Sequence, residues 1–170
     1  MKTTILALAV LVTVPAAAAA PRKGDAASET NPEAQAQVRK RLDEIWATFV
    51  SKDVSKLESF HLYGPRFTAF KDGQARTDGE ANKKGEREFA AVLTDSRVDM
   101  KDLAIAVYGD TAIATFNGDF SGKIDGHPVA EKQAATMVFV KYKGDWKIVH
   151  EHFSPLGPPG PASGPPHSKS

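Results

Sequence analysis

Cysteine is absent from this chain of 170 residues. Without thiols the protein forms no disulfide, so burial of apolar side chains must stabilise it, and thiol catalysis is excluded. An excess of charge of one sign is also missing, because 22 basic residues face 21 acidic ones and no basic cluster occurs. Such a chain has no electrostatic attraction for nucleic acid or an anionic membrane surface. We therefore expect no nucleic-acid partner.

Several motifs that carry well-known chemistry are missing as well. The sequence has no Gly-rich phosphate loop, no Gly-x-Ser-x-Gly elbow and no His-Glu-x-x-His. Nucleotide-binding, serine-hydrolase and zinc-protease functions therefore have no support. No cofactor is predicted.

A long hydrophobic run is lacking too. The apolar stretch from Ile5 to Val14 is shorter than the roughly 20 residues that cross a bilayer. It follows Lys2 and precedes an Ala-rich segment, which is the layout of a secretory signal peptide. Residues 1–20 are predicted to be that peptide, with an uncleaved anchor as the alternative. The mature chain is then periplasmic or secreted, with no membrane span.

Composition divides the remaining chain into three parts. Residues 21–30 are small and polar and predict a flexible leader, and residues 31–155 have the length of one domain. Residues 156–170 are rich in Pro and Gly, but the Gly spacing breaks at Ala162-Ser163, so no collagen repeat forms. We expect a disordered tail, and recruitment of a partner by it is the less favoured alternative.

Helical signals dominate the first half of the domain. Asn31-Pro32 is a typical helix start, and an apolar stripe follows it, in which Trp46 belongs either to the core or to the lining of a cavity. Asp53 opens a short helix that runs to Phe60. A third, weaker helix begins at Asp78 or Thr77 and ends near residue 93, with sparse apolar residues at Ala81, Phe89 and Val92.

Strand signals replace helical ones in the second half, after a short predicted strand at 67–70. From residue 97 onward, apolar side chains alternate with polar ones, and Gly109-Asp110 and Asp125-Gly126 predict tight hairpins. Two-residue turns pair Val107 with Ala112 and Gly118 with Gln133. One sheet face is then strongly apolar and must be covered by the helices.

The last strand, 146–155, holds the densest group of ionisable side chains. Side chains alternate between the two faces of a strand. One face therefore holds Trp146, Ile148, His150 and His152, and the other holds Lys147, Val149, Glu151 and Phe153. A three-residue turn at 143–145 directs Glu151 inward. A two-residue turn directs the Trp146 set inward instead.

The order of these elements, with Gly109-Asp110-Thr111-Ala112 and the segment from Trp146 to Ser154, resembles the nuclear-transport-factor-2-like superfamily. The similarity is greatest to its SnoaL-like branch and to the association domain of calcium/calmodulin-dependent kinase II. The resemblance implies an α+β cone, in which a curved antiparallel sheet wraps around N-terminal helices and leaves a pocket. It also implies a homodimer through the outer sheet face, and it favours the three-residue turn.

The kinase association domain has arginines in its pocket. This chain has Gly118 or a neighbour, Met137 and Phe153 at those positions, so the resemblance implies an apolar pocket and puts anionic ligands in doubt. A small apolar ligand is expected. The residues predicted to bind it are Trp46, His61, Tyr63, Phe116, Gln133, Met137, Glu151 and Phe153, and those predicted at the dimer interface are Trp146, Ile148, His150 and His152.

Glu151 is the candidate catalytic residue. Among Phe, Met and Val it would be a lone carboxylate whose charged form burial disfavours, which suits a general base in an isomerase or hydratase. A Glu at the pocket mouth, hydrogen-bonded to the backbone or a Tyr, is the structural alternative. His150 and His152 are spaced like two zinc ligands, with His61, Asp119 or Glu131 as possible thirds, but an interface role is favoured and no metal is predicted.

Overall fold

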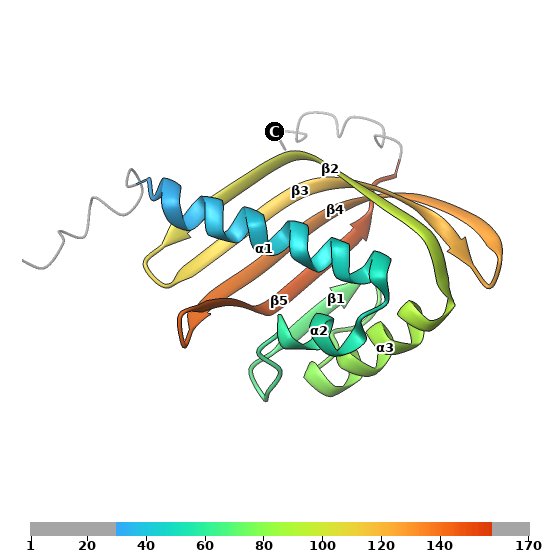
Figure 1. Ribbon diagram of the computed structural model, residues 1–170, viewed down its shortest axis with the longest axis horizontal. Coiled ribbons are helices and arrows are strands. Elements are labelled where there is room, and N and C mark those ends of the chain that lie inside the picture. Colours follow the sequence, from blue (N-terminus) through green and yellow to red (C-terminus); the bar gives the residue numbers. More distant parts are fainter. Residues whose placement is uncertain (1–29, 158–170) are drawn as a thin grey trace, which may run out of the picture.

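The computed structural model describes residues 30–157, which form three helices and a five-stranded sheet (Figure 1). The predicted signal peptide, almost all of the leader and most of the Pro/Gly-rich tail lie outside these residues, so the predictions about them stay untested. The elements are α1 (Pro32–Ser51), α2 (Val54–Ser59), β1 (Thr68–Lys71), α3 (Gly79–Val92), β2 (Leu93–Tyr108), β3 (Thr111–Ile124), β4 (His127–Tyr142) and β5 (Asp145–Pro155). None of the three helices is long and apolar enough to span a bilayer.

Each helix starts where the sequence predicts it. The side chain of Asn31 accepts a hydrogen bond from the backbone N–H of Ala34 at 3.0 Å, and Asp53 and Asp78 accept equivalent bonds at 3.0 and 2.9 Å. These caps satisfy backbone donors that a helix leaves free in its first turn. The predicted starts of the three helices are therefore confirmed.

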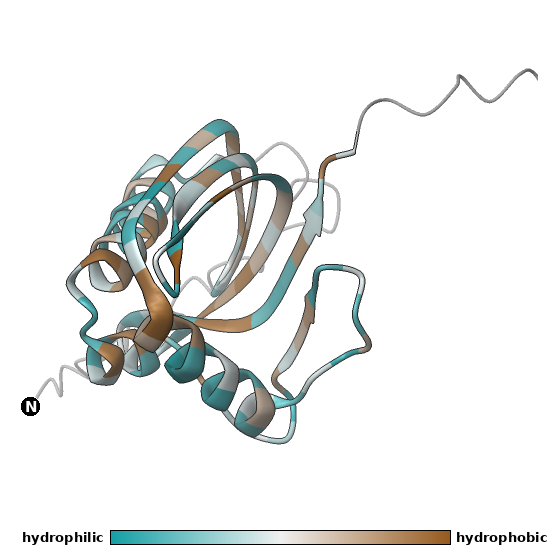
Figure 2. Ribbon diagram, turned by 90° about the vertical axis from the view of Figure 1, so that its right-hand side faces the viewer, coloured by the Kyte–Doolittle hydropathy of each residue, from teal (hydrophilic) through white to brown (hydrophobic). Residues whose placement is uncertain are grey.

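The sheet has the order β1-β5-β4-β3-β2. Its four long strands are antiparallel, and Val107 faces Ala112 and Gly118 faces Gln133 as predicted. The short β1 joins the edge of β5 in parallel, a pairing that the sequence did not indicate. Two bulges interrupt the register of β2, and such extra residues bend and twist a strand. The resulting curvature gives the predicted α+β cone (Figure 2).

Helix α1 lies across the concave face of the sheet (Figure 1). Its buried stripe includes Val38, Leu42 and Ile45, at most 2% exposed, and joins one core cluster with Ala112 and Ala114 of β3.

The turn between β4 and β5 differs from the favoured prediction. It has two residues, Lys143 and Gly144, with φ of 52° and 88°, and Tyr142 pairs with Asp145. Positive φ at both central residues suits the right-handed twist of a hairpin. The three-residue connection implied by the resemblance is therefore wrong.

Each of the two predicted orientations of β5, with Trp146 inward or with Glu151 inward, is correct for part of the strand, because the strand contains a bulge. Phe139 pairs with Ile148 but its neighbour Val138 pairs with His150, which leaves Val149 as an extra residue. One added residue reverses the alternation of all later side chains. Ile148 and Glu151 thus face the same interior, at 0% and 4% exposure.

Two residues predicted at a dimer interface consequently belong to the core. Trp146 is 3% exposed, and its indole N–H donates a hydrogen bond to Gln37 of α1 at 3.1 Å. Ile148 is fully buried. Because they precede the bulge, they point toward α1, so their placement on the open sheet face was wrong. His150 and His152 follow the bulge, pair with outward-facing residues of β4 and lie on the outer face.

Candidate functional site

A cavity of about 580 Å³ lies inside the cone and is lined by residues of α1, α3 and the concave sheet face. The indole of Trp46 meets the rings of Phe116 and Phe153 edge to face, at centroid distances of 6.4 and 6.5 Å. Edge-to-face packing is a favoured geometry for aromatic pairs. The cavity wall contains six phenyl or indole rings: Trp46, Phe49, Phe89, Phe116, Phe120 and Phe153.

The cavity brings together most of the residues predicted to bind a ligand. Seven of the eight line it: Trp46, His61, Phe116, Gln133, Met137, Glu151 and Phe153. Tyr63 is placed differently, because its ring stacks on that of His61 at 4.7 Å and is not part of the wall. The roles of these residues in binding stay predictions.

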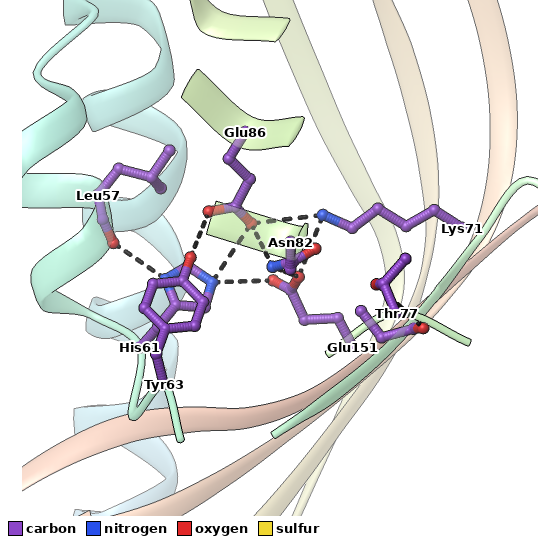
Figure 3. A network of polar contacts seen from close by, with 9 residues as sticks. Leu57, His61, Tyr63, Lys71, Thr77, Asn82, Glu86 and Glu151 are labelled. Carbon is purple, nitrogen blue, oxygen red and sulfur yellow. Dashed lines mark hydrogen bonds and ion pairs between the residues drawn. The ribbon is translucent and has the colours of Figure 1, made fainter. Parts of the chain in front are cut away.

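One end of the cavity is polar, and distant segments build it (Figure 3). His61 follows α2, and backbone hydrogen bonds join the residues on either side of it, Phe60 and Leu62, to Ile148 of β5 at 2.8 Å. This bridge brings the end of α2 to the last strand. The other members are Lys71 of β1, Asn82 and Glu86 of α3, and Glu151 of β5; with His61 we call them the polar cluster.

The hydrogen bonds of His61 define its protonation. Its Nδ1 lies 3.0 Å from the carbonyl oxygen of Leu57, and its Nε2 lies 3.3 Å from Glu151 and 3.4 Å from Glu86. A carbonyl oxygen can only accept, so Nδ1 donates, and an Nε2 that also donates satisfies both carboxyl groups; this geometry fits an imidazolium. Burial opposes this charge, but the two carboxylates outweigh it and raise the pKa of His61 to about 10.

Lys71 is the second cation of the polar cluster. Its ammonium lies 3.3 Å from an oxygen of Glu86 and 3.2 Å from one of Glu151. Desolvation alone would lower the pKa of Lys71, yet the charges of Glu151 and Glu86 raise it. Two cations therefore face two anions, and the polar cluster is neutral as a unit.

Glu151 does not have the surroundings expected from the sequence. Burial alone would raise the pKa of its carboxyl, but the positive charges of Lys71 and His61 act against it and hold the pKa below its usual value. Glu151 is thus a paired carboxylate and not a lone one, and the expected upward shift was wrong. Its two cationic partners come from segments 80 and more residues away in the sequence, which strand alternation cannot reveal.

Neutral donors complete the polar cluster. The amide of Asn82 donates to Glu86 at 3.0 Å and to Glu151 at 3.2 Å, and the hydroxyl of Tyr63 donates to Glu86 at 2.7 Å. Burial and the nearby charge of Glu86 raise the pKa of the Tyr63 phenol, so it stays a donor. Every oxygen of the two buried carboxylates has a donor, as buried charges require.

Lys71, Asn82 and Glu86 were not predicted from the sequence. The predicted inner residues of α3 were Ala81, Phe89 and Val92, whereas the buried side contains Gly79, Asn82, Glu86 and Ala90. Residues three or four apart share a helix face, so this spacing was a usable signal. The sparse apolar pattern of α3 indicated that polar side chains face inward.

His61, Glu86 and Glu151 also form a potential metal-ligand set. One ligand atom from each lies within 4.8 Å of the others, and imidazole and carboxylates suit divalent transition metals. In the present arrangement the imidazolium and Lys71 balance the carboxylates instead. No such group forms around the outer-face histidines in residues 30–157; Nδ1 of His150 lies 2.8 Å from the hydroxyl of Thr68.

The curved sheet, the enclosed helix and the cavity define a nuclear-transport-factor-2-like cone. Solved structures share this fold at low identity. A protein of Streptomyces avermitilis, provisionally named a dehydratase of this family, is 20% identical, with a TM-score of 0.69 over 75% of this chain and all of its own. The hub homology domain of a calcium/calmodulin-dependent kinase II from Chlamydomonas reinhardtii is 19% identical, with a TM-score of 0.59 over 74% of this chain and all of its own.

A Caulobacter vibrioides protein with a cystatin-like fold is 12% identical, with a TM-score of 0.61 over 74% of this chain and 92% of its own. The sequence of this chain matches the family model of the SnoaL-like domain over residues 38–158. The chain therefore belongs to the SnoaL-like family. No functionally curated protein matches the sequence.

Proposed function

We propose that this SnoaL-like protein binds a small, mainly apolar molecule inside the cone. The observation that carries the proposal is the cavity of about 580 Å³ with six aromatic rings in its wall. Its volume lies within the range of roughly 300–1,000 Å³ that is usual for small-molecule sites, which are mostly apolar with a few polar groups. The polar cluster supplies such groups at one end.

The mutual pairing of the polar cluster favours binding over proton transfer. His61, Lys71 and Glu151 hold one another in their charged forms, with raised pKa values for the two cations and a lowered one for the carboxyl. A general acid or base works best when its pKa lies near the working pH. None of these three groups meets that condition.

Filling the cavity from Gly118 tests the proposal. A Cβ at this buried position would meet only the Phe116 ring, at 3.6 Å, which is an ordinary contact. The added isopropyl group of Gly118→Val occupies cavity volume. The neutral fluorophore N-phenyl-1-naphthylamine is therefore expected to lose apolar contact area worth ~1 kcal/mol and to bind about fivefold more weakly. The melting temperature should stay equal or rise, since Gly weakens a strand.

The matched control is Thr115→Val, an exposed position on the same strand that should leave the affinity unchanged. Fluorescence titration of both variants measures the difference. A wild-type protein that does not bind the fluorophore, or a Gly118→Val variant with unchanged affinity, contradicts the proposal.

An isomerase or hydratase with Glu151 as general base is the second candidate. It is supported by the position of Glu151 in the cavity wall, 3.3 Å from His61. Against it stands the lowered pKa of the carboxyl, which makes Glu151 a weak base. Exchange of a carbonyl substrate's α-proton with D₂O, followed by NMR, distinguishes the two. Exchange by the wild type but not by a folded Glu151→Gln variant would favour the enzyme.

We further propose a homodimer through the outer sheet face. That face carries Ile113, Val138 and Val140, all half-buried, and Tyr108 and Phe70 are 51% and 38% exposed. Apolar side chains gathered on one sheet face favour a contact, and two copies related by a two-fold axis would bury them. Trp146 and Ile148 do not contribute, because they face the core.

Sedimentation velocity of the wild type and of Val138→Glu tests the dimer. The wild type is expected to sediment as a dimer, and the variant as a monomer, because the new carboxylate would be desolvated at the contact. Ala36→Glu, an exposed change on α1, is the control and should remain dimeric. A monomeric wild type at about 10 µM would refute the assembly.

A further inference from the structure

Two carboxylates outside the polar cluster also line the cavity, Asp72 and Glu131. We propose that they form an anionic subsite at the cavity mouth and that the preferred ligand is an organic cation, a protonated amine with an aromatic or aliphatic body. The inference rests on the proposed binding function and specifies the chemical class of its ligand.

Gln133 links the two carboxylates. Its side-chain amide donates to Asp72 at 3.1 Å and to Glu131 at 3.1 Å. Asp72 is further fixed by its backbone N–H, which donates to the carbonyl oxygen of Phe153 at 2.9 Å. One amide thus holds two anionic groups close together. Asp72 is exposed and Glu131 half-buried, which places the pair where the cavity meets solvent.

Neither carboxylate forms an ion pair with any residue between 30 and 157. Burial, followed by the negative charge of Asp72, raises the pKa of Glu131, so the ionised pair is disfavoured as it stands. A bound cation would relieve that repulsion. A bound anion would add to it.

The other charged groups of the cavity wall do not cancel this subsite. His61 and Lys71 are paired with Glu86 and Glu151 inside the neutral polar cluster. Arg97 remains, and it acts only weakly on Asp95, whose carboxyl pKa is lowered mainly by its hydrogen bond with Lys123 and the charge of that lysine. With the polar cluster neutral, Asp72, Glu131 and Arg97 leave the wall with one net negative charge.

The aromatic wall suits the same class of ligand. Phe153 belongs to the wall, and its backbone carbonyl oxygen accepts the hydrogen bond from the backbone N–H of Asp72. An apolar ring surface therefore begins directly beside the anionic subsite. Aromatic faces attract organic cations, and their apolar area holds the rest of the molecule. An amine at the mouth with its body on Trp46 and Phe153 satisfies both features.

Three fluorescent probes with one aromatic body test the inference: 1-pyrenemethylamine, 1-pyrenemethanol and 1-pyrenecarboxylate. At pH 7 and low salt the amine is expected to bind about tenfold tighter than the alcohol, and the carboxylate more weakly than either, because partly buried charges at close range interact strongly. The amine's advantage should shrink as salt is added.

Two isosteric variants remove the charges one at a time. Glu131→Gln and Asp72→Asn are each expected to reduce the preference for the amine about threefold and to leave the affinity for the alcohol unchanged. Asp110→Asn, an exposed carboxylate in the turn between β2 and β3, is the matched control and should have no effect.

Equal affinity for all three probes, or the tightest binding by the carboxylate, overturns the cation preference while the proposed apolar site stands. A preference for the amine that survives both charge-removing variants overturns the assignment to Asp72 and Glu131. Failure of all three probes to bind overturns the proposed function together with this inference.

Discussion

Replacement of Glu151 by Gln is expected to lower the free energy of unfolding by about 3–5 kcal/mol, the usual cost of removing one partner from a buried ion pair. The carboxylate is 4% exposed and contacts both His61 and Lys71. Without it, two cations share the single charge of Glu86 in a desolvated site. Chemical denaturation followed by tryptophan fluorescence measures the loss.

A double-mutant cycle separates this charge effect from lost packing. Lys71→Met alone leaves the polar cluster with one excess negative charge, and Glu151→Gln alone leaves one excess positive charge. Both changes together restore neutrality, so the double variant should be more stable than the sum of the single losses predicts, by about 1–3 kcal/mol. Additive losses would show that Lys71 and Glu151 do not interact. Glu88→Gln, at an exposed surface site, should change stability by less than about 0.5 kcal/mol.

Stability should decline at both ends of the pH range, and His61 governs the alkaline side. Its pKa rises from 6.5 to about 10 on folding. A group whose pKa is raised by folding stabilises the protein fully below its unfolded value and loses that contribution as pH rises through the folded value. The decline is therefore expected between pH 6.5 and about 10, and it amounts to several kcal/mol, since each pKa unit is worth about 1.4 kcal/mol.

Glu151 governs the acid side with the opposite sign. Folding lowers the pKa of its carboxyl below the ordinary value of 4.5. Its stabilising contribution is therefore complete above about pH 4.5 and is lost progressively as pH falls below it. Maximum stability is expected near neutral pH, where His61 is still charged and Glu151 is ionised.

Unfolding free energies between pH 3 and pH 10 test both limbs. His61→Gln should be less stable at pH 6 and should lack most of the alkaline decline, because it has no proton to lose. His127→Gln, at the exposed start of β4 and away from the polar cluster, should retain the wild-type profile. An alkaline decline of unchanged size in His61→Gln would show that another group causes it.

Local sequence chemistry determined much of the fold. Asn31, Asp53 and Asp78 start helices because a short polar side chain beside the next few backbone N–H groups is sufficient for a cap. Gly109 and Gly126 close hairpins because glycine tolerates positive φ. The alternation of side chains then predicted the faces of β3 and most of β4. The resemblance of the last strand to known proteins predicted the cone-shaped fold, and solved structures with a cystatin-like fold confirm it.

The tertiary structure alone decided the orientation of β5 and the composition of the polar cluster. The bulge at Val149 follows from packing on both sides, since Trp146 and Ile148 must reach α1 while Glu151 must reach His61 and Lys71. A one-residue bulge has no reliable local signature, and it reverses every later side chain. The charge state of Glu151 depends on His61 and Lys71, which only folding brings within 4 Å of its carboxylate. The ionisable groups are therefore visible in the sequence, whereas their pKa values depend on the tertiary structure.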